Sequence, residues 1–530
     1  MTEAPVAAEQ SGQMTHREVL EALSGLLLAM FVAMLSSTVV TNALPRIVTD
    51  LDGSQTGYSW VVVATLLTMT ATTPVWGKLA DLFSKKLLVQ SALVIYSAGS
   101  LIAGLAPSME VLIGARAIQG LGVGGLTALV QVVIASMVSP RERGRYSGYI
   151  GATFALATVS GPLIGGLIVD TPGLGWRWCF FLGLPVAALA FVVLQKTLHL
   201  PVRRREVHVD YLGATLLVAG VSILLVWVSL AGTSFAWGSA TSALLVALGL
   251  VVVGAAIYVE ARVAVEPVVP LRLFRDRTTA LATVASVLVG LAMFGSTVYL
   301  SQYFQLSRGM TPTMAGLMSV AMVGGLLVSS IVSGRLITRT GRWKRFLLGG
   351  MVLVIAGLSL LARIDDTTSL WYVGAGMAVL GLGLGAVMQN LVLSVQNNVA
   401  QADLGAASSL VAFFRSMGGS IGVAALGAVL THQVADGVTA ALSRLGIPAG
   451  AHRNGTIPDV SSLDEPFRSI FEHAFGEATG HLFLVAVPFA VLALVCVLFI
   501  EEVPLRTTIL RADEIGPEAD PDAAVGRRKG

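Results

Sequence analysis

Charged residues are scarce in this sequence of 530 residues: they make up 12% of it, whereas 55% of the residues are hydrophobic. A soluble protein of this size carries about 25% charged residues. The apolar residues are spread along the whole chain, which excludes a soluble enzyme with one membrane anchor. Their number is enough for about fourteen membrane spans of ~20 residues each. We therefore expect an all-α, polytopic membrane protein.

Cysteine is scarcer still, with two residues in the whole chain. Cys179 and Cys496 both lie in apolar stretches that are far apart in the sequence. Neither their spacing nor their surroundings indicate a disulfide or a metal site. We expect two ordinary buried thiols.

The sequence also lacks the signatures of several other protein classes. Its first 20 residues are polar, without the basic start, short apolar run and cleavage site of a secretory signal peptide. We therefore expect the first helix to serve as the insertion signal. No Walker-type glycine–lysine loop indicates nucleotide binding. We expect a protein that is not an enzyme, with no cofactor, no metal and no nucleic-acid partner.

Apolar runs bounded by charges or by Pro and Gly clusters predict fourteen transmembrane helices. They lie at about 22–44, 58–79, 87–106, 110–138, 146–169, 175–195, 211–231, 239–260, 279–304, 312–335, 345–363, 369–394, 405–431 and 480–500. A long polar connection at 432–479 precedes the last helix. It is either an outer cap or a flexible connection.

The basic residues orient these helices. With the N-terminus inside, 25 of the 34 Lys and Arg residues fall on the inner side and seven on the outer side. The other two, Arg116 and Arg415, fall within spans. An excess of Lys and Arg marks cytoplasmic loops. The distribution supports an even number of spans in the cytoplasmic membrane, with both termini cytoplasmic.

Two segments on the inner side repeat one pattern. Gly77-Lys78-Leu79 is followed by basic residues at Lys85 and Lys86, and Gly334-Arg335-Leu336 is followed by Gly341-Arg342. Such a repeat predicts two related six-helix bundles with a substrate site between them. The predicted division is a cytoplasmic segment at 1–21, a bundle at 22–200, an inserted helix pair with linkers at 201–272, a second bundle at 273–505 and a cytoplasmic tail at 506–530.

Several motifs, in order, resemble those of the major facilitator superfamily. They are the loop from Gly77 to Lys86, Arg116-Ala117-Ile118-Gln119-Gly120, Gly161-Pro162 with Gly165-Gly166, and Leu35-Ser36-Ser37-Thr38 with Asn42-Ala43-Leu44-Pro45. The last of these is similar to the helix-1 motif of the fourteen-helix drug:proton antiporters of the EmrB/QacA type. The resemblance covers about 25–505. It implies a secondary transporter that exports drug-like or amphiphilic molecules by alternating access, in exchange for protons.

The resemblance also implies roles for particular residues. Gating is implied for Gly77, Asp81, Lys85, Lys86, Gly334, Arg335, Gly341 and Arg342. Coupling is implied for Arg116, Gln119, Gly120 and Arg415. The antiporter motif is Gly161, Pro162, Gly165 and Gly166, and the helix-1 motif includes Ser36, Thr38, Asn42 and Pro45.

The same residues have plainer interpretations. Asp81 is either a solvated charge in a turn that sets topology, or a latch that pairs with basic groups or a helix N-terminus in one conformation. Arg116 either reaches the outer interface or takes part in coupling. Several amides either line the substrate cavity or join helices to each other: Gln131, Gln302, Gln305, Gln389, Asn390 and Gln396.

An embedded acid is the most informative absence. Ser36 stands where the drug exporters usually have an aspartate, and no Asp or Glu lies in the middle of a predicted span. The remaining proton carriers are Asp81, Glu477, His481 and Glu21. The absence disfavours strongly cationic substrates and favours neutral, zwitterionic or lipid-like ones.

Two other functions remain open at this stage. One is export of a specific endogenous lipid or secondary metabolite without an embedded carboxylate. The other is a membrane sensor or scaffold that transports nothing. In each case we expect a monomer in the lipid bilayer.

Overall fold

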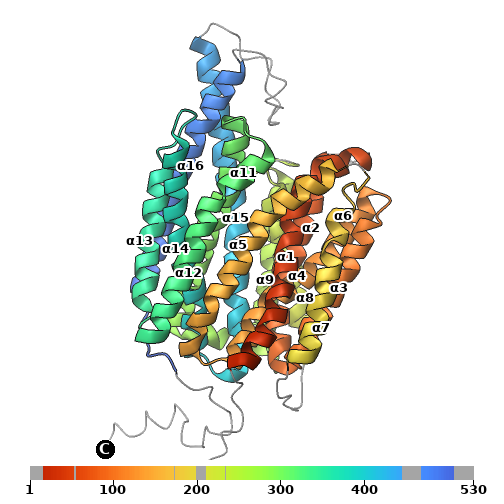
Figure 1. Ribbon diagram of the computed structural model, residues 1–530, viewed down its shortest axis with the longest axis vertical. Coiled ribbons are helices and arrows are strands. Elements are labelled where there is room, and N and C mark those ends of the chain that lie inside the picture. The colour runs from red at the N-terminus through yellow and green to blue at the C-terminus, as the bar shows by residue number, and fades with distance from the viewer. Residues whose placement is uncertain are drawn as a thin grey trace, which may run out of the picture.

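The computed structural model describes residues 16–52, 55–171, 173–198, 210–232, 234–444 and 467–506, and these form a bundle of helices (Figure 1). Within these ranges, thirteen helices are long and apolar enough to cross a membrane. They coincide with thirteen of the fourteen predicted spans. The other predicted span, 146–169, falls within a helix of 31 residues, α5 (Pro140–Asp170). At about 1.5 Å per residue this helix is also longer than a bilayer core is thick.

The first bundle contains the helices before residue 200. They are α1 (His16–Asp50), α2 (Gln55–Leu82), α3 (Lys85–Gly104), α4 (Met109–Met137), α5, α6 (Trp178–Phe181) and α7 (Gly183–Thr197). Leu26, Trp76 and Leu129 belong to one buried apolar cluster of this bundle, and Trp176 and Phe180 to a second. Cys179 is a free, buried thiol, as is Cys496 in the second bundle, which confirms that prediction.

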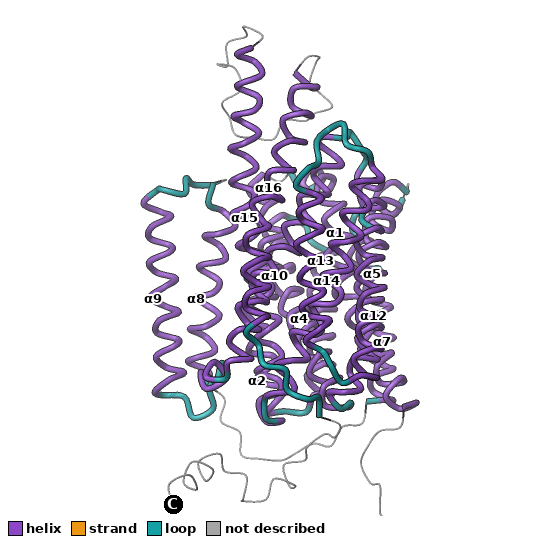
Figure 2. The backbone as a smooth tube through the Cα atoms, turned by 90° about the vertical axis from the view of Figure 1, so that its left-hand side faces the viewer, coloured by secondary structure: helices purple, strands orange, loops and turns teal. Residues whose placement is uncertain are grey.

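The inserted pair consists of α8 (Tyr211–Leu230) and α9 (Ala240–Arg262), which stand beside the main bundle as a hairpin (Figure 2). Side-chain caps begin both helices, because Asp210 accepts a hydrogen bond from the amide of Gly213 and Ser239 from that of Ser242. The pair is not isolated from the main bundle. Val221 and Leu225 of α8 pack into a cluster with residues of two other helices, one from each bundle.

The second bundle contains the helices after residue 270. They are η1 (Leu271–Arg275), α10 (Arg277–Gln302), the π-helical turn η2 (Tyr303–Ser307), α11 (Pro312–Met318), α12 (Val320–Thr340), α13 (Lys344–Leu361), α14 (Leu370–Asn398), η3 (Gln401–Asp403), α15 (Leu404–Arg444) and α16 (Phe467–Leu498). Its buried core includes Leu347, Met351 and Phe483.

Two segments that were expected to be loops are largely helical. The connection expected at 432–479 is helical up to Arg444 and again from Phe467, so α15 and α16 project beyond the other helices (Figures 1 and 2). Polar residues within these extensions made them look like a loop, but a helix outside the bilayer tolerates a polar face. Gly77 to Leu82 is likewise the last turn of α2 rather than a loop.

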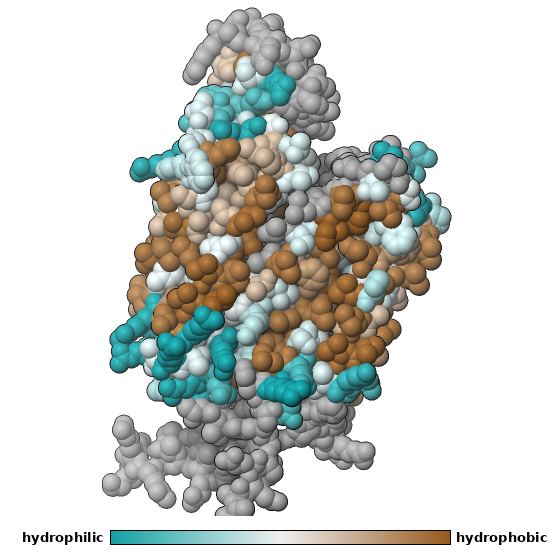
Figure 3. Space-filling view, in the orientation of Figure 1, coloured by the Kyte–Doolittle hydropathy of each residue, from teal (hydrophilic) through white to brown (hydrophobic). Residues whose placement is uncertain are grey.

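The two ends of the molecule differ in charge. We call the end that carries Lys78, Lys85, Arg141 and Arg339 the basic end, and the end from which α15 and α16 project the stalk end. A broad hydrophobic surface separates hydrophilic patches at the two ends (Figure 3). That surface is the one expected to face lipid.

Candidate functional site

The basic end holds the two bundles together through a carboxylate on a helix end. Asp81, on the last turn of α2, accepts hydrogen bonds from the backbone amides of Gly405 and Ala406, each at 2.8 Å. These amides belong to the first turn of α15, where backbone N–H groups have no partner within the helix. The positive end of the helix dipole also favours an anion there. Of the two interpretations of Asp81, this geometry corresponds to pairing with a helix N-terminus.

Close backbone packing surrounds this contact. A side chain at Gly77 would overlap Ser409 and would come within 2.6 Å of the carbonyl oxygen of Gly405. Only glycine therefore lets α2 approach α15 closely enough for Asp81 to reach its amides. Lys85 and Lys86 lie on the first turn of α3, and Lys86 donates to the carbonyl of Gln195 at 2.7 Å.

A second contact across the bundles uses a cation on a helix end. The guanidinium of Arg141, on the first turn of α5, donates to the carbonyls of Thr338 at 3.2 Å and Arg339 at 3.4 Å. These carbonyls lie in the last turn of α12, where acceptors are left without partners within the helix and the dipole favours a cation. The contact therefore has the opposite polarity to that of Asp81.

Glycines again permit this approach. A side chain at Gly144 would overlap the carbonyl of Gly334, and one at Gly334 would overlap the carbonyl of Gly144. Gly341 ends α12 with a positive φ of 70°, a conformation that favours glycine. Arg335 and Arg342 are exposed at this end.

Arg143 joins the bundles next to this contact. Its guanidinium donates to the side-chain oxygen of Gln396 at 2.9 Å and to the carbonyl of Val138 at 3.0 Å. Gln396 in turn donates to the hydroxyl of Ser408 at 2.9 Å. We call the contacts of Asp81, Arg141 and Arg143 between the two bundles the basic-end closure. Gln396 was a candidate for the cavity lining, but it lies in this closure. In the sequence, Arg141 and Arg143 indicated only the orientation of the helices, although both lie within three residues of the Pro140 that starts α5.

A buried polar network lies within the first bundle. Arg116, 3% exposed, donates from Nε to the carbonyl of Val61 at 3.2 Å and from a terminal nitrogen to Gln119 at 2.6 Å. Gln119 then donates to the hydroxyls of Ser36 at 2.9 Å and Ser100 at 2.8 Å. Arg116 is thus turned inward and satisfied by oxygens of the bundle, so it does not reach toward the outer interface.

Ser36 completes this network where a carboxylate would be expected. Within the described ranges no Asp or Glu side chain contacts Arg116 or Gln119, so the guanidinium charge is met by neutral oxygens alone. Gly120, one residue farther along α4, lies against α2, since a side chain there would overlap Thr68.

The proline–glycine segment of α5 lies against α1. A side chain at Gly161 would overlap Thr38, whose hydroxyl donates to the carbonyl of Ala157 at 3.4 Å. The backbone of α5 stays helical through Pro162, Gly165 and Gly166, and that of α1 through Asn42 and Pro45. The side chains of Asn42, Pro45 and Pro162 lie outside the described part.

The remaining predicted residues are divided between the interface and their own helices. Gln131 of α4 donates to Gln389 of α14 at 3.2 Å, which connects the two bundles. Asn390 and Gln305 instead donate to carbonyls of their own helices, Ala386 and Ser301. The side chains of Gln302 and Arg415 make no hydrogen bond or ion pair within the described part of the chain. The coupling role implied for Arg415 stays a prediction.

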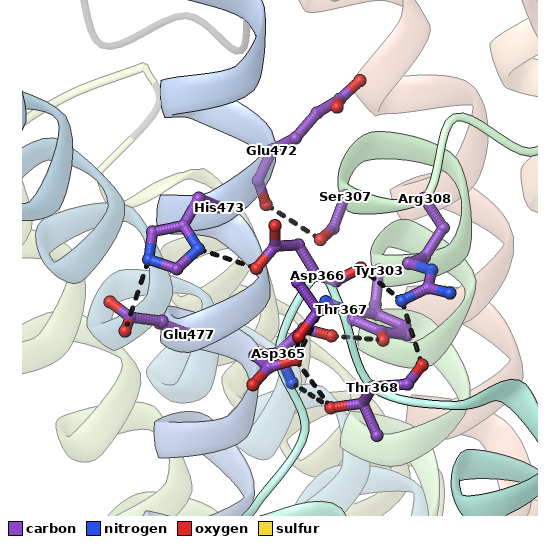
Figure 4. Close-up of polar contacts among 10 residues, drawn as sticks. All are labelled: Tyr303, Ser307, Arg308, Asp365, Asp366, Thr367, Thr368, Glu472, His473 and Glu477. Carbon is purple, nitrogen blue, oxygen red and sulfur yellow. Dashed lines mark hydrogen bonds and ion pairs between the residues drawn. The ribbon is translucent and has the colours of Figure 1, made fainter.

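A polar network at the stalk end was not predicted (Figure 4). Tyr303 of η2 donates to the carbonyl of Asp365 at 2.7 Å, and Arg308 donates to the carbonyls of Asp366 and Thr368. His473 of α16 contacts the Asp366 carboxylate at 2.7 Å. These contacts join elements of the second bundle, so they stabilise that bundle and do not connect it to the first.

The turn from Asp365 to Thr368 in this network is stabilised by its own side chains. Partial burial raises the pKa of Asp365, but hydrogen bonds from Thr368 and Thr367 outweigh it, so the pKa lies below its ordinary value. The carboxylate therefore stays ionised and fixes the turn. In the described residues no group of three or more His, Cys, Asp or Glu side chains is placed to hold a metal.

Comparisons with known proteins agree with this architecture. The Major Facilitator Superfamily family model matches residues 26–423. The chain is 34% identical over 518 residues to the MFS-type transporter Rv1877 of Mycobacterium tuberculosis, covering 97% of this chain and 74% of that one. It is 34% identical over 421 residues to the multidrug transporter protein MdtP of Bacillus subtilis, covering 79% and 76%. It is 32% identical over 510 residues to the efflux pump dotC of Dothistroma septosporum, covering 94% and 86%.

Solved structures show the same fold. The proton:xylose symporter XylE superposes with a TM-score of 0.59 at 11% identity, covering 92% of this chain and 97% of that one. The human organic anion transporter MFSD10 superposes with a TM-score of 0.55 at 13% identity, covering 89% and 99%.

Proposed function

The chain belongs to the Major Facilitator Superfamily, and from this premise we propose that it exports drug-like or amphiphilic small molecules across the cytoplasmic membrane by alternating access, in exchange for protons. Two relatives are named a multidrug transporter and an efflux pump, which supports outward transport. In this proposal the protein is a monomer in the bilayer with both termini in the cytoplasm.

The basic-end closure is the observation that carries the proposal. Asp81 and Arg141 each place a charge on a helix end of the opposite bundle. Both contacts need the bundles in one relative orientation, since a helix end offers its unpaired groups in one direction only. Rotation of the bundles breaks both contacts together. That behaviour provides two states of different energy, which alternating access requires.

In this proposal the basic end faces the cytoplasm, and the structure is the cytoplasm-closed state. Arg143 with Gln396 adds a third contact to the closure. Gln131 and Gln389 lie between the bundles, where paired amides offer a neutral substrate both donors and acceptors. The absence of a described carboxylate at the Arg116 network favours neutral, zwitterionic or lipid-like substrates over strongly cationic ones.

Flux into reconstituted vesicles tests the proposal. Wild-type protein should move a neutral amphiphilic dye faster to the side of the vesicle membrane that corresponds to the cell exterior when a proton gradient is imposed. Asp81→Asn should lower the rate, whereas Glu501→Gln, which removes an exposed acid at the same end, should not. Flux that ignores the gradient would refute antiport, and no flux of any tested compound would refute transport.

A second candidate is export of one endogenous lipid or secondary metabolite without proton exchange. The specific observation in its favour is Ser36, which completes the Arg116 network with a neutral hydroxyl. This candidate predicts gradient-independent flux of a narrow set of compounds. The same vesicle experiment therefore separates the two.

A further inference from the structure

Two carboxylates meet at the basic end of the inserted helix pair. Asp210 precedes α8 and uses Oδ1 to accept from the amide of Gly213 at 2.8 Å. Glu260, in the last turn of α9 and only 7% exposed, uses Oε2 to accept from the amide of Val269 at 3.2 Å. Each residue thus has one oxygen in use and one left over.

The two remaining oxygens are buried and have no hydrogen-bond partner in the part of the chain that the structure describes. They are Oδ2 of Asp210 and Oε1 of Glu260. A buried polar atom without a partner costs about 1–3 kcal/mol, and more if it is charged. Such an arrangement is stable only if something else satisfies these oxygens.

The two oxygens also face the same small space. Oε1 of Glu260 lies 3.1 Å from the point where a side chain at Gly213 would begin, and Oδ2 of Asp210 lies closer to that point. They are therefore within about 6 Å of each other, a separation at which two like charges disfavour each other. Gly213 leaves this space open because it has no side chain.

A cation from another helix acts on this pair, because the charge of Lys78 on α2 reaches Glu260. Lys78 of α2 lies 3.3 Å from Glu266, with side chains 11% and 15% exposed. Among the described residues Asp210, Glu260, Glu266 and Lys78, the three carboxylates exceed the ammonium by two negative charges when every group is ionised. One bound proton reduces this excess of negative charge from two to one, and no additional cation is then needed for that reduction. A metal ion is a poorer fit, because it would compete with the ammonium of Lys78 and because the described residues place no group of three or more possible ligands together here.

The position of α8 relates this pair to the closure. Val221 and Leu225 of α8 pack with Ala71 of α2 and with Phe413 of α15. These are the two helices that Asp81 joins, and Lys78 lies one helical turn before Asp81. Motion between α2 and α15 therefore changes the surroundings of the carboxylate pair.

We propose that Asp210 and Glu260 form a proton-binding site that holds one proton in this closed state. The proton converts one carboxylate into a carboxyl group, whose O–H donates to the unused oxygen of the other, directly or through a water molecule. When α2 and α15 separate, water reaches the pair and the proton leaves toward the cytoplasm. The release direction rests on the proposed function, whereas the binding of the proton does not.

Infrared spectroscopy of the purified full-length protein in detergent tests the binding. At neutral pH, ordinary carboxylates with pKa values near 4 are ionised. Wild-type protein should nevertheless show a protonated carboxyl C=O band that shifts in D₂O. Glu260→Gln and Asp210→Asn should each remove or shift this band, and both keep the size of the side chain. Asp210→Asn also keeps the cap of α8, because the side-chain oxygen of asparagine caps a helix as that of aspartate does.

A matched control removes an acid at the same end. Glu501→Gln changes an exposed carboxylate after α16 and should leave the band as it is. Thermal unfolding of each variant verifies that it is folded. No protonated band in the wild type, or a band that neither variant alters, would overturn the proposal.

Vesicle flux then relates the site to transport. Glu260→Gln should retain downhill flux but lose its stimulation by a proton gradient. Wild-type stimulation without the infrared band would overturn the site and leave the proposed antiport intact. The band without stimulation in the wild type would overturn the antiport and leave the proton site intact.

Discussion

Asp81→Asn is expected to shift the protein from the cytoplasm-closed toward the cytoplasm-open conformation. In the structure each oxygen of Asp81 accepts one backbone amide at 2.8 Å from the first turn of α15. Asparagine keeps one acceptor oxygen but presents an NH₂ group to the other amide and removes the charge.

The size of the shift follows from these losses. A hydrogen bond to a charged group contributes about 1.5–3 kcal/mol, and a charge at a helix end about 0.3–2 kcal/mol. Because asparagine keeps one of the two bonds, we expect the closed state to lose about 2–3 kcal/mol. This change corresponds to about 30- to 150-fold in the ratio of closed to open molecules.

Distances between spin labels measure that ratio. Leu87→Cys on α3 and Arg345→Cys on α13 place labels on exposed positions of the two bundles at the basic end. Cys179 and Cys496 are buried and can be replaced, so that only the two introduced cysteines react with the spin label. Asp81→Asn should add a population with a longer distance.

The control and the refuting result use the same labels. Glu501→Gln removes an exposed acid at the same end and should leave the distances unchanged. A distance distribution for Asp81→Asn that matches the wild type would refute the role of Asp81 as a latch.

Substitutions test three other contacts, each with its own measurement. Ser36→Asp places a carboxylate beside the Arg116 network. Vesicles with this variant should therefore export a permanently cationic dye faster than vesicles with the wild type. Equal export would contradict the argument that the lack of a carboxylate here disfavours cationic substrates. Gly144→Ala should open the basic end in the spin-label assay, because its methyl group overlaps the carbonyl of Gly334, whereas Gly349→Ala, with open space around it, should not. Arg116→Lys keeps the charge, but lysine cannot donate to both the Val61 carbonyl and Gln119 as the guanidinium does. The free energy of unfolding, measured by thermal unfolding, should therefore fall by about 2–3 kcal/mol. An unchanged unfolding temperature would exclude a structural role for these two hydrogen bonds.

The membrane spans were predictable because insertion depends on the hydropathy of each segment by itself. A helix in lipid must be apolar along about 20 consecutive residues, whatever its neighbours are. Thirteen predicted spans match helices that are long and apolar enough to cross a membrane. The same rule failed at 432–444, because that part of α15 lies beyond the apolar run and its polar residues carry no span signal.

The glycine motifs were also visible in the sequence, but their partners were not. Gly77 and Gly334 stood out through the repeat, yet nothing local indicates that one faces Ser409 and the other Gly144. Asp81 was a candidate for pairing with a helix N-terminus. Only the packing of the bundles identifies that helix as α15.

The charged residues show the difference most clearly. The sequence by itself determined how many charges the chain has and that none of the acids lies in the middle of a predicted span, and it predicted the side of the membrane on which the basic residues fall. Only the tertiary structure decided that Arg141 reaches the end of α12 and that Asp210 and Glu260, 50 residues apart, share one buried space. The physical reason is that hydropathy is a property of each segment alone, whereas the pairing of charges depends on which helix ends are brought together by packing.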